Sequence, residues 1–374
     1  MVDQPSSGRA FAVVTGGGTS GHVVPALAIA ESLVAAGHPA QSLHYVGTSR
    51  GVETRLVPAA GLPHTFFDVT GLQRSLSSRN ALFLPRLASS TWKASRLLRR
   101  LRPRVVVNVG GYASFPATFA ARLLRIPTVI VSYDRRPGLV SRLLAHGATA
   151  CAVAFPDSTL PRAEHTGAPV RRQMIDLNRP VQRVAACVEL GLPADRFVIA
   201  VMCGSLGAQA VNNAVNGAVE QLADRRDLCV YHVVGDRFVG EAAPERDGRD
   251  GIMYRVIGYE DRMAQLYAAA DLMITRAGAG TIAELATVGA PAIVVPWPGA
   301  AENHQVDNAR MLGDIGAAIV IEQADLTVER LVMEIERLSM SPDTLRALSI
   351  SAREAGAMHR SGALIGLIER VASR

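Results

Sequence analysis

A glycine-rich loop near the start of the chain is the first pattern that could do chemistry. The sequence Gly16-x-Gly18-x-x-Gly21 separates an apolar segment from an amphipathic one, and His22 follows the last glycine. Such a loop opens a helix whose free backbone N–H groups favour an anion, and an imidazole beside them can act as a base. The alternative is that His22 only caps the helix.

The same glycine spacing matches the dinucleotide-binding fingerprint. That fingerprint also needs an acidic residue about 20 residues further on, at the end of the second strand, to hold the ribose hydroxyls. The segment in that place, 43–48, reads Leu-His-Tyr-Val-Gly-Thr and contains no acid. The sequence therefore argues against NAD binding.

A second candidate site lies in the later half of the chain. Residues 276–284 follow the apolar segment 272–275, so they are expected at the carboxyl end of a strand, where α/β proteins bind ligands. Small residues there allow close backbone approach to a phosphate, and Glu284 can accept hydrogen bonds from a ribose diol. The alternative is that Glu284 only stabilises its own helix dipole. A polar cluster at 302–305, Glu-Asn-His-Gln, offers further partners for sugar hydroxyls.

These motifs lie in an alternation of short apolar and longer amphipathic segments, which predicts an α/β fold with parallel sheets. Strands are predicted at 11–15, 105–109, 128–132, 197–202, 229–234, 272–275 and 292–295, with helices at 23–36 and 211–222. The order of strand, glycine loop and helix occurs once in each half, which predicts two Rossmann-like domains. The polar, Pro- and Gly-rich segment 155–180 is predicted as a linker, and 342–374 as one or two helices.

Basic residues are concentrated in one region of the chain. Nine of the 39 Lys and Arg lie between residues 74 and 104, which contain no Asp or Glu. Apolar residues are set among them, an arrangement typical of contact with an anionic membrane surface. The alternatives are a solvated helix face above core residues, and nucleic-acid binding, for which no groove-reading motif is present. The predicted membrane contacts are Arg79, Leu82, Phe83, Leu84, Arg86 and Lys93.

Length and composition exclude several classes of protein. A chain of 374 residues with 49% apolar and 19% charged residues suits two domains and is not globally disordered. Its four cysteines form no CxxC pair, which argues against a zinc site and a disulfide framework. No apolar run is long enough to cross a bilayer, and residues 1–10 lack the apolar core of a signal peptide. A soluble intracellular protein is therefore expected.

The ordered set of motifs resembles the MurG family, UDP-N-acetylglucosamine: N-acetylmuramyl-(pentapeptide) pyrophosphoryl-undecaprenol N-acetylglucosamine transferases. These enzymes convert lipid I to lipid II in peptidoglycan synthesis. The resemblance covers nearly the whole chain and is most specific at residues 17–22, 25–28, 110–112, 167–171, 204–208, 278–284, 304–305 and 308–309.

The resemblance implies a GT-B fold, with two Rossmann-like domains whose parallel sheets face a central cleft. Residues 1–168 would bind the acceptor and the membrane, residues 169–350 would bind the UDP-sugar, and 351–374 would form a C-terminal helix able to cross back to the first domain. It further implies inversion at the anomeric carbon, UDP-N-acetylglucosamine and a lipid-linked muramyl-pentapeptide as substrates, no cofactor and no catalytic metal. The expected location is the cytoplasmic face of the cell membrane, with peripheral attachment.

The family's site residues are carried over by matching motifs. His22 matches the candidate base. The positions that match donor-binding residues are Thr19, Ser20, Gly21, Arg171, Ser205, Glu260, Ala279, Gly280, Thr281, Ile282, Ala283, Glu284 and Gln305. Within this set Glu260 matches a position whose backbone meets uracil, Glu284 one that holds the ribose, and Gln305 one that faces the transferred sugar.

Two positions depart from the family pattern. Ser132-Tyr133-Asp134-Arg135 stands where His-Glu-x-Asn is usual, and Leu206 stands where Gln is usual. Asp134 and Arg135 are therefore candidate contacts with the acceptor or the donor, as is Tyr112 of the matching motif 110–112. The departures motivate an alternative hypothesis, a MurG-like glycosyltransferase with another UDP-sugar and a lipid-linked or natural-product acceptor. A third hypothesis is a nucleotide-sugar-binding protein without transfer.

Overall fold

The computed structural model describes residues 9–69, 83–204, 207–300 and 303–374. It divides into two compact units: unit 1 comprises Met1–Arg172 and Met358–Arg374, and unit 2 comprises Gln173–Ala357. The sequence analysis places the domain boundaries after residues 168 and 350. In the structure the first boundary lies four residues later, after Arg172, and the second lies seven residues later, after Ala357.

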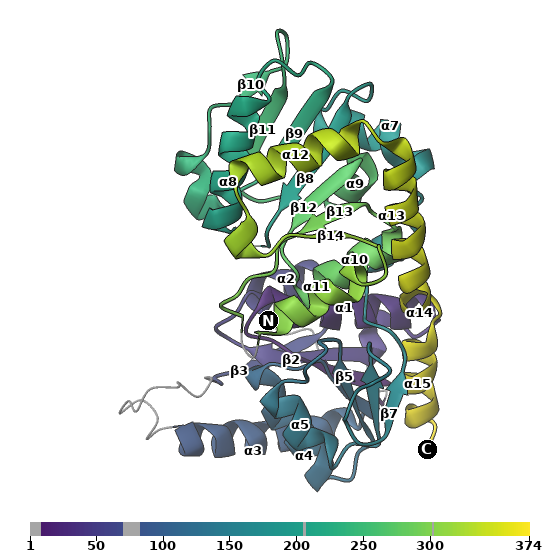
Figure 1. Ribbon diagram of the computed structural model, residues 1–374. Coiled ribbons are helices and arrows are strands. Elements are labelled where there is room, and N and C mark those ends of the chain that lie inside the picture. The colour runs from purple at the N-terminus through teal and green to yellow at the C-terminus, as the bar shows by residue number, and fades with distance from the viewer. Residues whose placement is uncertain (1–8, 70–82, 205–206, 301–302) are drawn as a thin grey trace. The chain divides into compact units, whose positions relative to one another are not determined.

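Unit 1 is built on a seven-stranded parallel sheet (Figure 1). Its central strands are fully buried and almost entirely apolar, as strands covered on both faces must be. The spatial order is β3 (His64–Phe67), β2 (Leu43–Thr48), β1 (Ala12–Thr15), β4 (Val105–Asn108), β5 (Thr128–Ser132), β6 (Ala150–Val153) and β7 (Ala163–His165).

Two groups of helices pack on this sheet, one group on each face (Figure 1). One group contains α1 (Ser20–Ala35), α2 (Glu53–Ala59) and α15 (Ala363–Ala372). The other contains α3 (Phe83–Leu101), α4 (Phe115–Leu123) and α5 (Leu139–Ala145). Helix α15 contacts β4, β5, β6 and α1, and buries Leu364, Leu367, Ile368 and Val371.

Unit 2 has a second seven-stranded sheet, parallel except at the edge strand β10. Its order is β10 (Arg246–Asp247), β11 (Met253–Ile257), β9 (Leu228–Val233), β8 (Phe197–Met202), β12 (Leu272–Thr275), β13 (Ala292–Val294) and β14 (Ile319–Val320). The helices of this unit are α6 (Arg172–Ile175), whose first residue is the last of unit 1, α7 (Arg179–Leu190), α8 (Gln209–Gln221), α9 (Met263–Ala269), α10 (Ala279–Val288), α11 (His304–Gly313), α12 (Val328–Ser339) and α13 (Pro342–Ala355).

Three details of the predicted elements are corrected by the structure. The expected linker 155–180 contains β7, an edge strand whose three residues are all exposed and therefore give no apolar signal. Helix α1 begins at Ser20 rather than residue 23, because propensity underrates Ser and Gly in a first turn. The tail forms three helices, α13, α14 (Ala357–Arg360) and α15, separated at Gly356 and Gly362.

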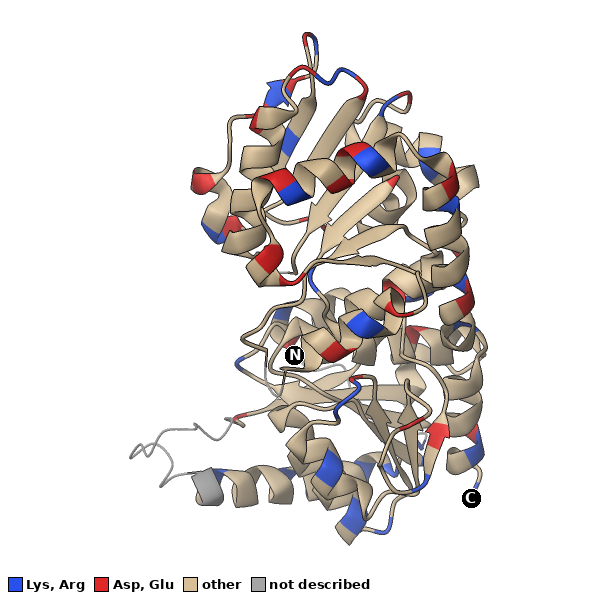
Figure 2. Cartoon of the chain, in the orientation of Figure 1, with Lys and Arg blue, Asp and Glu red and all other residues tan. Residues whose placement is uncertain are grey.

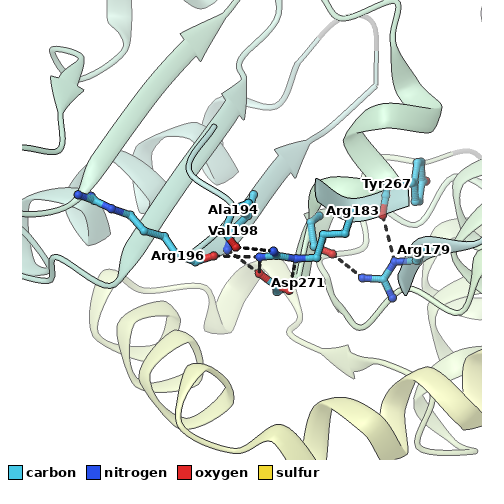
Figure 3. Close-up of polar contacts among 8 residues, drawn as sticks. Arg179, Arg183, Ala194, Arg196, Val198, Tyr267 and Asp271 are labelled. Carbon is cyan, nitrogen blue, oxygen red and sulfur yellow. Dashed lines mark hydrogen bonds and ion pairs between the residues drawn. The ribbon is translucent and has the colours of Figure 1, made fainter. Parts of the chain in front are cut away.

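A cluster of charged groups ties helix α7 to the amino ends of two strands in unit 2 (Figure 3). Arg183 donates to both carboxylate oxygens of Asp271, at 3.0 and 2.7 Å, and to the carbonyls of Ala194 and Arg196. Asp271 also accepts the N–H of Val198 at 2.8 Å. The carboxylate therefore joins α7, β8 and β12 through one side chain.

A neighbouring arginine, Arg179, holds the same helix through hydrogen bonds to backbone carbonyls. Its guanidinium donates to the carbonyls of Tyr267, Ala270 and Gly289. Burial lowers the pKa of Arg179 to about 10, despite the opposing effect of Asp271. The side chain nevertheless stays charged at neutral pH, and its hydrogen bonds fix the start of α7.

We predict that Asp271→Ala destabilises unit 2, because Arg183 and the N–H of Val198 lose their acceptor together. The free energy of unfolding should fall by about 2–4 kcal/mol. The chain has two tryptophans, so in a Trp92→Phe background the fluorescence of Trp297 follows urea unfolding of unit 2. The matched control is Asp250→Ala, whose carboxylate is 98% exposed and 3.9 Å from Arg226. An equal effect of both substitutions would contradict the prediction.

Candidate functional site

The carboxyl ends of β1, β4 and β5 meet at one edge of the unit 1 sheet, because the three strands are adjacent and parallel. Beyond them lies a cavity of about 240 Å³. Three residues singled out from the sequence line it: His22 from α1, Tyr112 from the turn after β4, and Asp134 after β5. The fold therefore brings together the predicted base and two of the predicted substrate contacts.

The imidazole of His22 is held tightly by its neighbours. Its Nδ1 lies 3.1 Å from the hydroxyl of Thr19. Gly110 and Gly111 pack against the ring so closely that a Cβ on either would lie 3.0 to 3.3 Å from its atoms. Burial lowers the pKa of His22, although the charges of Asp134 and Glu53 act in the opposite direction. The side chain is therefore neutral at pH 7 and able to accept a proton.

The remaining residues of the first loop lie around the start of α1. Thr19 is the N-cap residue of that helix, and Thr19 and Gly21 are exposed. Arg135 turns away from the cavity and forms an ion pair with Asp157 at 2.7 Å. It also lies over the ring of Phe155. Of the departures from the family pattern, Asp134 thus lines the cavity and Arg135 does not.

Several residues that line this cavity or support the loops around it give little signal in the sequence. Tyr133 is buried and its hydroxyl donates to the carbonyl of Gly21. Asn108 accepts the N–H of Gly110 at 2.7 Å and donates to Thr118, which shapes the turn after β4. Glu53 accepts the N–H of Gly18. The signal that could have pointed to Glu53 is an acidic residue just after the two glycines Gly47 and Gly51.

In unit 2 the predicted nucleotide site lies at the start of α10, beyond the carboxyl end of β12. Gly278 is the N-cap residue, and the N–H groups of Ala279, Gly280 and Thr281 have no acceptor within the helix. A helix start of this kind attracts a phosphate. The N–H of Ile282 already donates to the carbonyl of Gly278 at 2.9 Å.

Side chains further along α10 face the core. Ile282 is 1% exposed and Ala283 is 2% exposed, so neither offers its side chain to a ligand. Glu284 is also buried, with 8% exposed. A carboxylate at this depth is not an exposed helix-end acid.

Two other predicted donor residues are engaged in hydrogen bonds. The carboxylate of Glu260 accepts the N–H and guanidinium of Arg262 and the hydroxyl of Tyr231. Burial alone raises the pKa of Glu260, but these hydrogen bonds lower it below its usual value. Gln305 accepts the N–H of Trp297 at 3.0 Å, which ties the start of α11 to the loop after β13.

Two residues that the sequence analysis includes in its motifs, without giving them a role, support the loop before α10. Arg276 donates to the carbonyls of Val295 and Pro296 and to the side chain of Gln323. Asn308 is buried and donates to the carbonyl of Ala277 at 3.2 Å. Of the remaining predicted residues, Arg171 belongs to unit 1, and Ser205 and Leu206 lie outside the described residues.

Comparison with known protein families matches both units. The model of the glycosyltransferase family 28 N-terminal domain matches residues 12–153, and that of the family 28 C-terminal domain matches residues 198–361. The chain belongs to glycosyltransferase family 28. It is also 37% identical over 97% of its length to a Desulforudis audaxviator protein and 41% identical over 92% to one from Anaeromyxobacter dehalogenans.

Both relatives bear the name UDP-N-acetylglucosamine--N-acetylmuramyl-(pentapeptide) pyrophosphoryl-undecaprenol N-acetylglucosamine transferase, and the chain spans 98% and 88% of their lengths. These identities confirm that this family 28 chain is a member of the MurG group. Among solved structures it is similar to Acinetobacter baumannii MurG, with a TM-score of 0.73 and 28% identity over 98% of this chain and 100% of that one. The predicted GT-B fold is thereby confirmed.

We predict that the imidazole of His22 titrates below its usual value of 6.5, because burial disfavours the charged form. NMR titration of the histidine Cε1 protons should show this, with His22→Gln assigning the resonance. His44 and His232 should titrate near pH 4.

The same shifts make the protein less stable in acid. Since the unfolded chain binds protons at these histidines near pH 6.5 and the folded chain does not, the free energy of unfolding should fall as the pH drops from 6.5 toward 4.

In the NMR titration, a His22 midpoint at or above 6.5 would show that the imidazole is not held in its neutral form.

Proposed function

We propose that this protein transfers N-acetylglucosamine from UDP-N-acetylglucosamine to the lipid-linked N-acetylmuramyl-pentapeptide, the step from lipid I to lipid II in peptidoglycan synthesis. The observation that carries the proposal is a neutral histidine in the unit 1 cavity of a chain with full-length relatives named for this reaction.

In the proposed reaction a hydroxyl of the acceptor's muramyl sugar attacks C1 of N-acetylglucosamine with inversion. His22 takes the hydroxyl proton as the new C–O bond forms, and the bond from C1 to the UDP oxygen breaks. General-base assistance of this kind is worth about 10²- to 10⁴-fold in rate. The N–H groups at the start of α10 would stabilise the negative charge on the departing UDP.

We further propose that no metal or cofactor takes part, since a helix N-terminus can stabilise the diphosphate. Purified protein should transfer radiolabelled N-acetylglucosamine to a lipid-linked muramyl acceptor at the same rate with and without EDTA. Absence of transfer would refute the function, and a requirement for a divalent cation would refute the metal-independent chemistry.

The alternative hypothesis is a related glycosyltransferase with another UDP-sugar or acceptor. It is favoured by Asp134, which lines the cavity in a segment that departs from the family pattern. Competition with UDP-glucose and UDP-glucuronate distinguishes the two, because a preference for either over UDP-N-acetylglucosamine would favour the alternative. UDP-sugar binding without release of UDP, whatever the acceptor, would indicate a binding protein.

We predict that Glu284→Ala raises the KM for the UDP-sugar without unfolding the protein. A hydrogen bond from a ribose hydroxyl to a carboxylate is worth about 1.5–3 kcal/mol, which corresponds to roughly a tenfold to hundredfold loss. Glu334→Ala is a control for the burial of an acid, since Glu334 is 5% exposed and binds Arg330 and Arg337 on α12. If the KM and kcat of Glu284→Ala equal those of the unchanged protein, Glu284 has no role in donor binding.

The basic stretch supplies a candidate membrane contact on α3. Arg86, Lys93 and Arg96 are exposed, and Figure 2 shows no acidic residue along this helix. Trp92 is 56% exposed and lies 5.0 Å below the guanidinium of Arg96. Arg79 and Leu82, and the side chains of Phe83 and Leu84, lie outside what the structure describes.

We propose peripheral attachment to the cytoplasmic face of the cell membrane through this helix. An exposed indole among cations suits shallow insertion beneath anionic headgroups. No helix within the described part of the chain is both long and apolar enough to cross a bilayer.

We predict that the protein sediments with anionic phosphatidylglycerol vesicles at low salt, is released at high salt, and binds neutral vesicles poorly. Replacing Arg86, Lys93 and Arg96 with Ser should weaken binding about a hundredfold, at roughly 1 kcal/mol per charge. The matched control changes Arg226, Arg249 and Arg346 of unit 2 to Ser, since these are at least 71% exposed. Equal losses for the two triple variants would show that α3 is not the contact.

A further inference from the structure

Among the described acids of unit 1, Glu53 is the least exposed, at 0%. It is the first residue of α2, and its carboxylate faces the glycine loop between β1 and α1. Oε1 accepts the N–H of Gly18 at 3.0 Å and that of Thr48 at 3.1 Å, and Oε2 lies 3.3 Å from the same Gly18 nitrogen. The buried acids Glu260 and Glu334 instead bind arginines.

Glycines leave the space that this carboxylate occupies. A Cβ on Gly17 would lie 2.2 Å from Oε1, and one on Gly51 would lie 1.9 Å from Oε2. Gly47 approaches the side chain as well, with its Cβ position 3.3 Å from Oε1 and from Cγ. Three separate glycines around one carboxylate indicate that the backbone is built to accommodate the charge.

Two tyrosine hydroxyls hold the ends of the same loop. Tyr45 donates to the carbonyl of Gly16 at 2.8 Å, and Tyr133 donates to the carbonyl of Gly21. Glu53 binds the middle of the loop at Gly18, where φ is +93°. The loop that leads into His22 is therefore fixed at its first, third and last residues by side chains from β2, from α2 and from the segment after β5.

We infer that Glu53 is a positioning residue for the base: its carboxylate fixes the loop that carries His22, and its charge stabilises the imidazolium that forms when His22 takes a proton. The stabilisation of the imidazolium rests on the proposed transfer reaction, whereas the fixing of the loop does not. A carboxylate away from water acts strongly on a nearby developing cation, because little solvent screens it.

A test of Glu53 must distinguish its effect on the pKa of His22 from the effects of the other charged and titratable groups around the imidazole. Asp134 follows β5, Glu53 begins α2, and both raise the pKa of His22 against the effect of burial. Tyr112 and Tyr133 face the same cavity, and burial raises the pKa of each above its usual value, so neither changes charge near neutral pH. An effect of Glu53 is thus expected in addition to that of Asp134.

The test is Glu53→Gln in the full-length protein, a change that keeps the size of the side chain and removes its charge. The kcat should fall about tenfold or more, and the acid limb of kcat/KM should move about half a pH unit lower. The same shift should appear in the NMR titration of His22, which requires no activity. If the protein does not catalyse the proposed transfer, the NMR titration of His22 still tests the electrostatic role of Glu53.

Two control variants separate charge from position. Glu53→Asp keeps the charge but withdraws the carboxylate from Gly18, so kcat should fall while the acid limb stays in place. Tyr45→Phe removes one loop contact and no charge near neutral pH, so it should also leave the acid limb in place. An unchanged His22 midpoint in Glu53→Gln would overturn the electrostatic part. If that variant does not fold, an undiminished kcat in Glu53→Asp would overturn the positioning role.

Discussion

The arrangement of unit 1 depends on how closely two loops approach each other. A Cβ on Gly111, after β4, would lie 2.3 Å from the carbonyl oxygen of Gly17, after β1. With φ of +79°, Gly111 also adopts a backbone conformation that other residues rarely take. Only glycine fits this contact, and the contact places Gly110 and Gly111 against the ring of His22. The neutral state of the imidazole and the shape of the adjoining cavity both follow from it.

The same strand–loop–helix design occurs in both units, but the charged groups around the two loops differ. In unit 1 the loop after β1 carries an imidazole and lies above a buried carboxylate, which disfavours an anion at Gly18. In unit 2 the start of α10 presents N–H groups with no acid beneath Gly278 among the contacts described there, and Arg276 lies just before it. A glycine loop therefore shows only that the backbone can approach another group closely. The charged side chains behind the loop determine whether an anion is favoured there.

Much of the fold could be predicted from the sequence, because the strands and the glycine loops depend on local patterns. The buried parallel strands are short apolar runs, and β5, β8 and β12 fall on the predicted residues. His22, Tyr112 and Asp134 were each candidates from the sequence, but only the strand order of the structure brings them to one cavity. The edge strand β7 could not be found, since its exposed Ala, Glu and His lack any alternation.

The supporting residues were harder to predict for a physical reason. Glu53 lies 35 residues from Gly18, and Tyr133 lies 112 residues from Gly21. Their roles arise from tertiary packing, and a buried Tyr or Glu has the same appearance in a sequence as an exposed one. Glu284 differs because its motif already suggested a ligand, and its role in donor binding stays a prediction.

Helix α15 has a consequence for how the protein is made. It covers β4, β5 and β6 of unit 1, with the hydrogen bond between His38 and Glu369 and the ion pair between Arg370 and Glu164 at its end, yet the ribosome produces it only after all of unit 2. Until then the apolar surface that Leu367 and Ile368 will cover is open to solvent. Unit 2 is contiguous and can fold as it emerges, whereas unit 1, although begun first, can be completed only after unit 2 has been made.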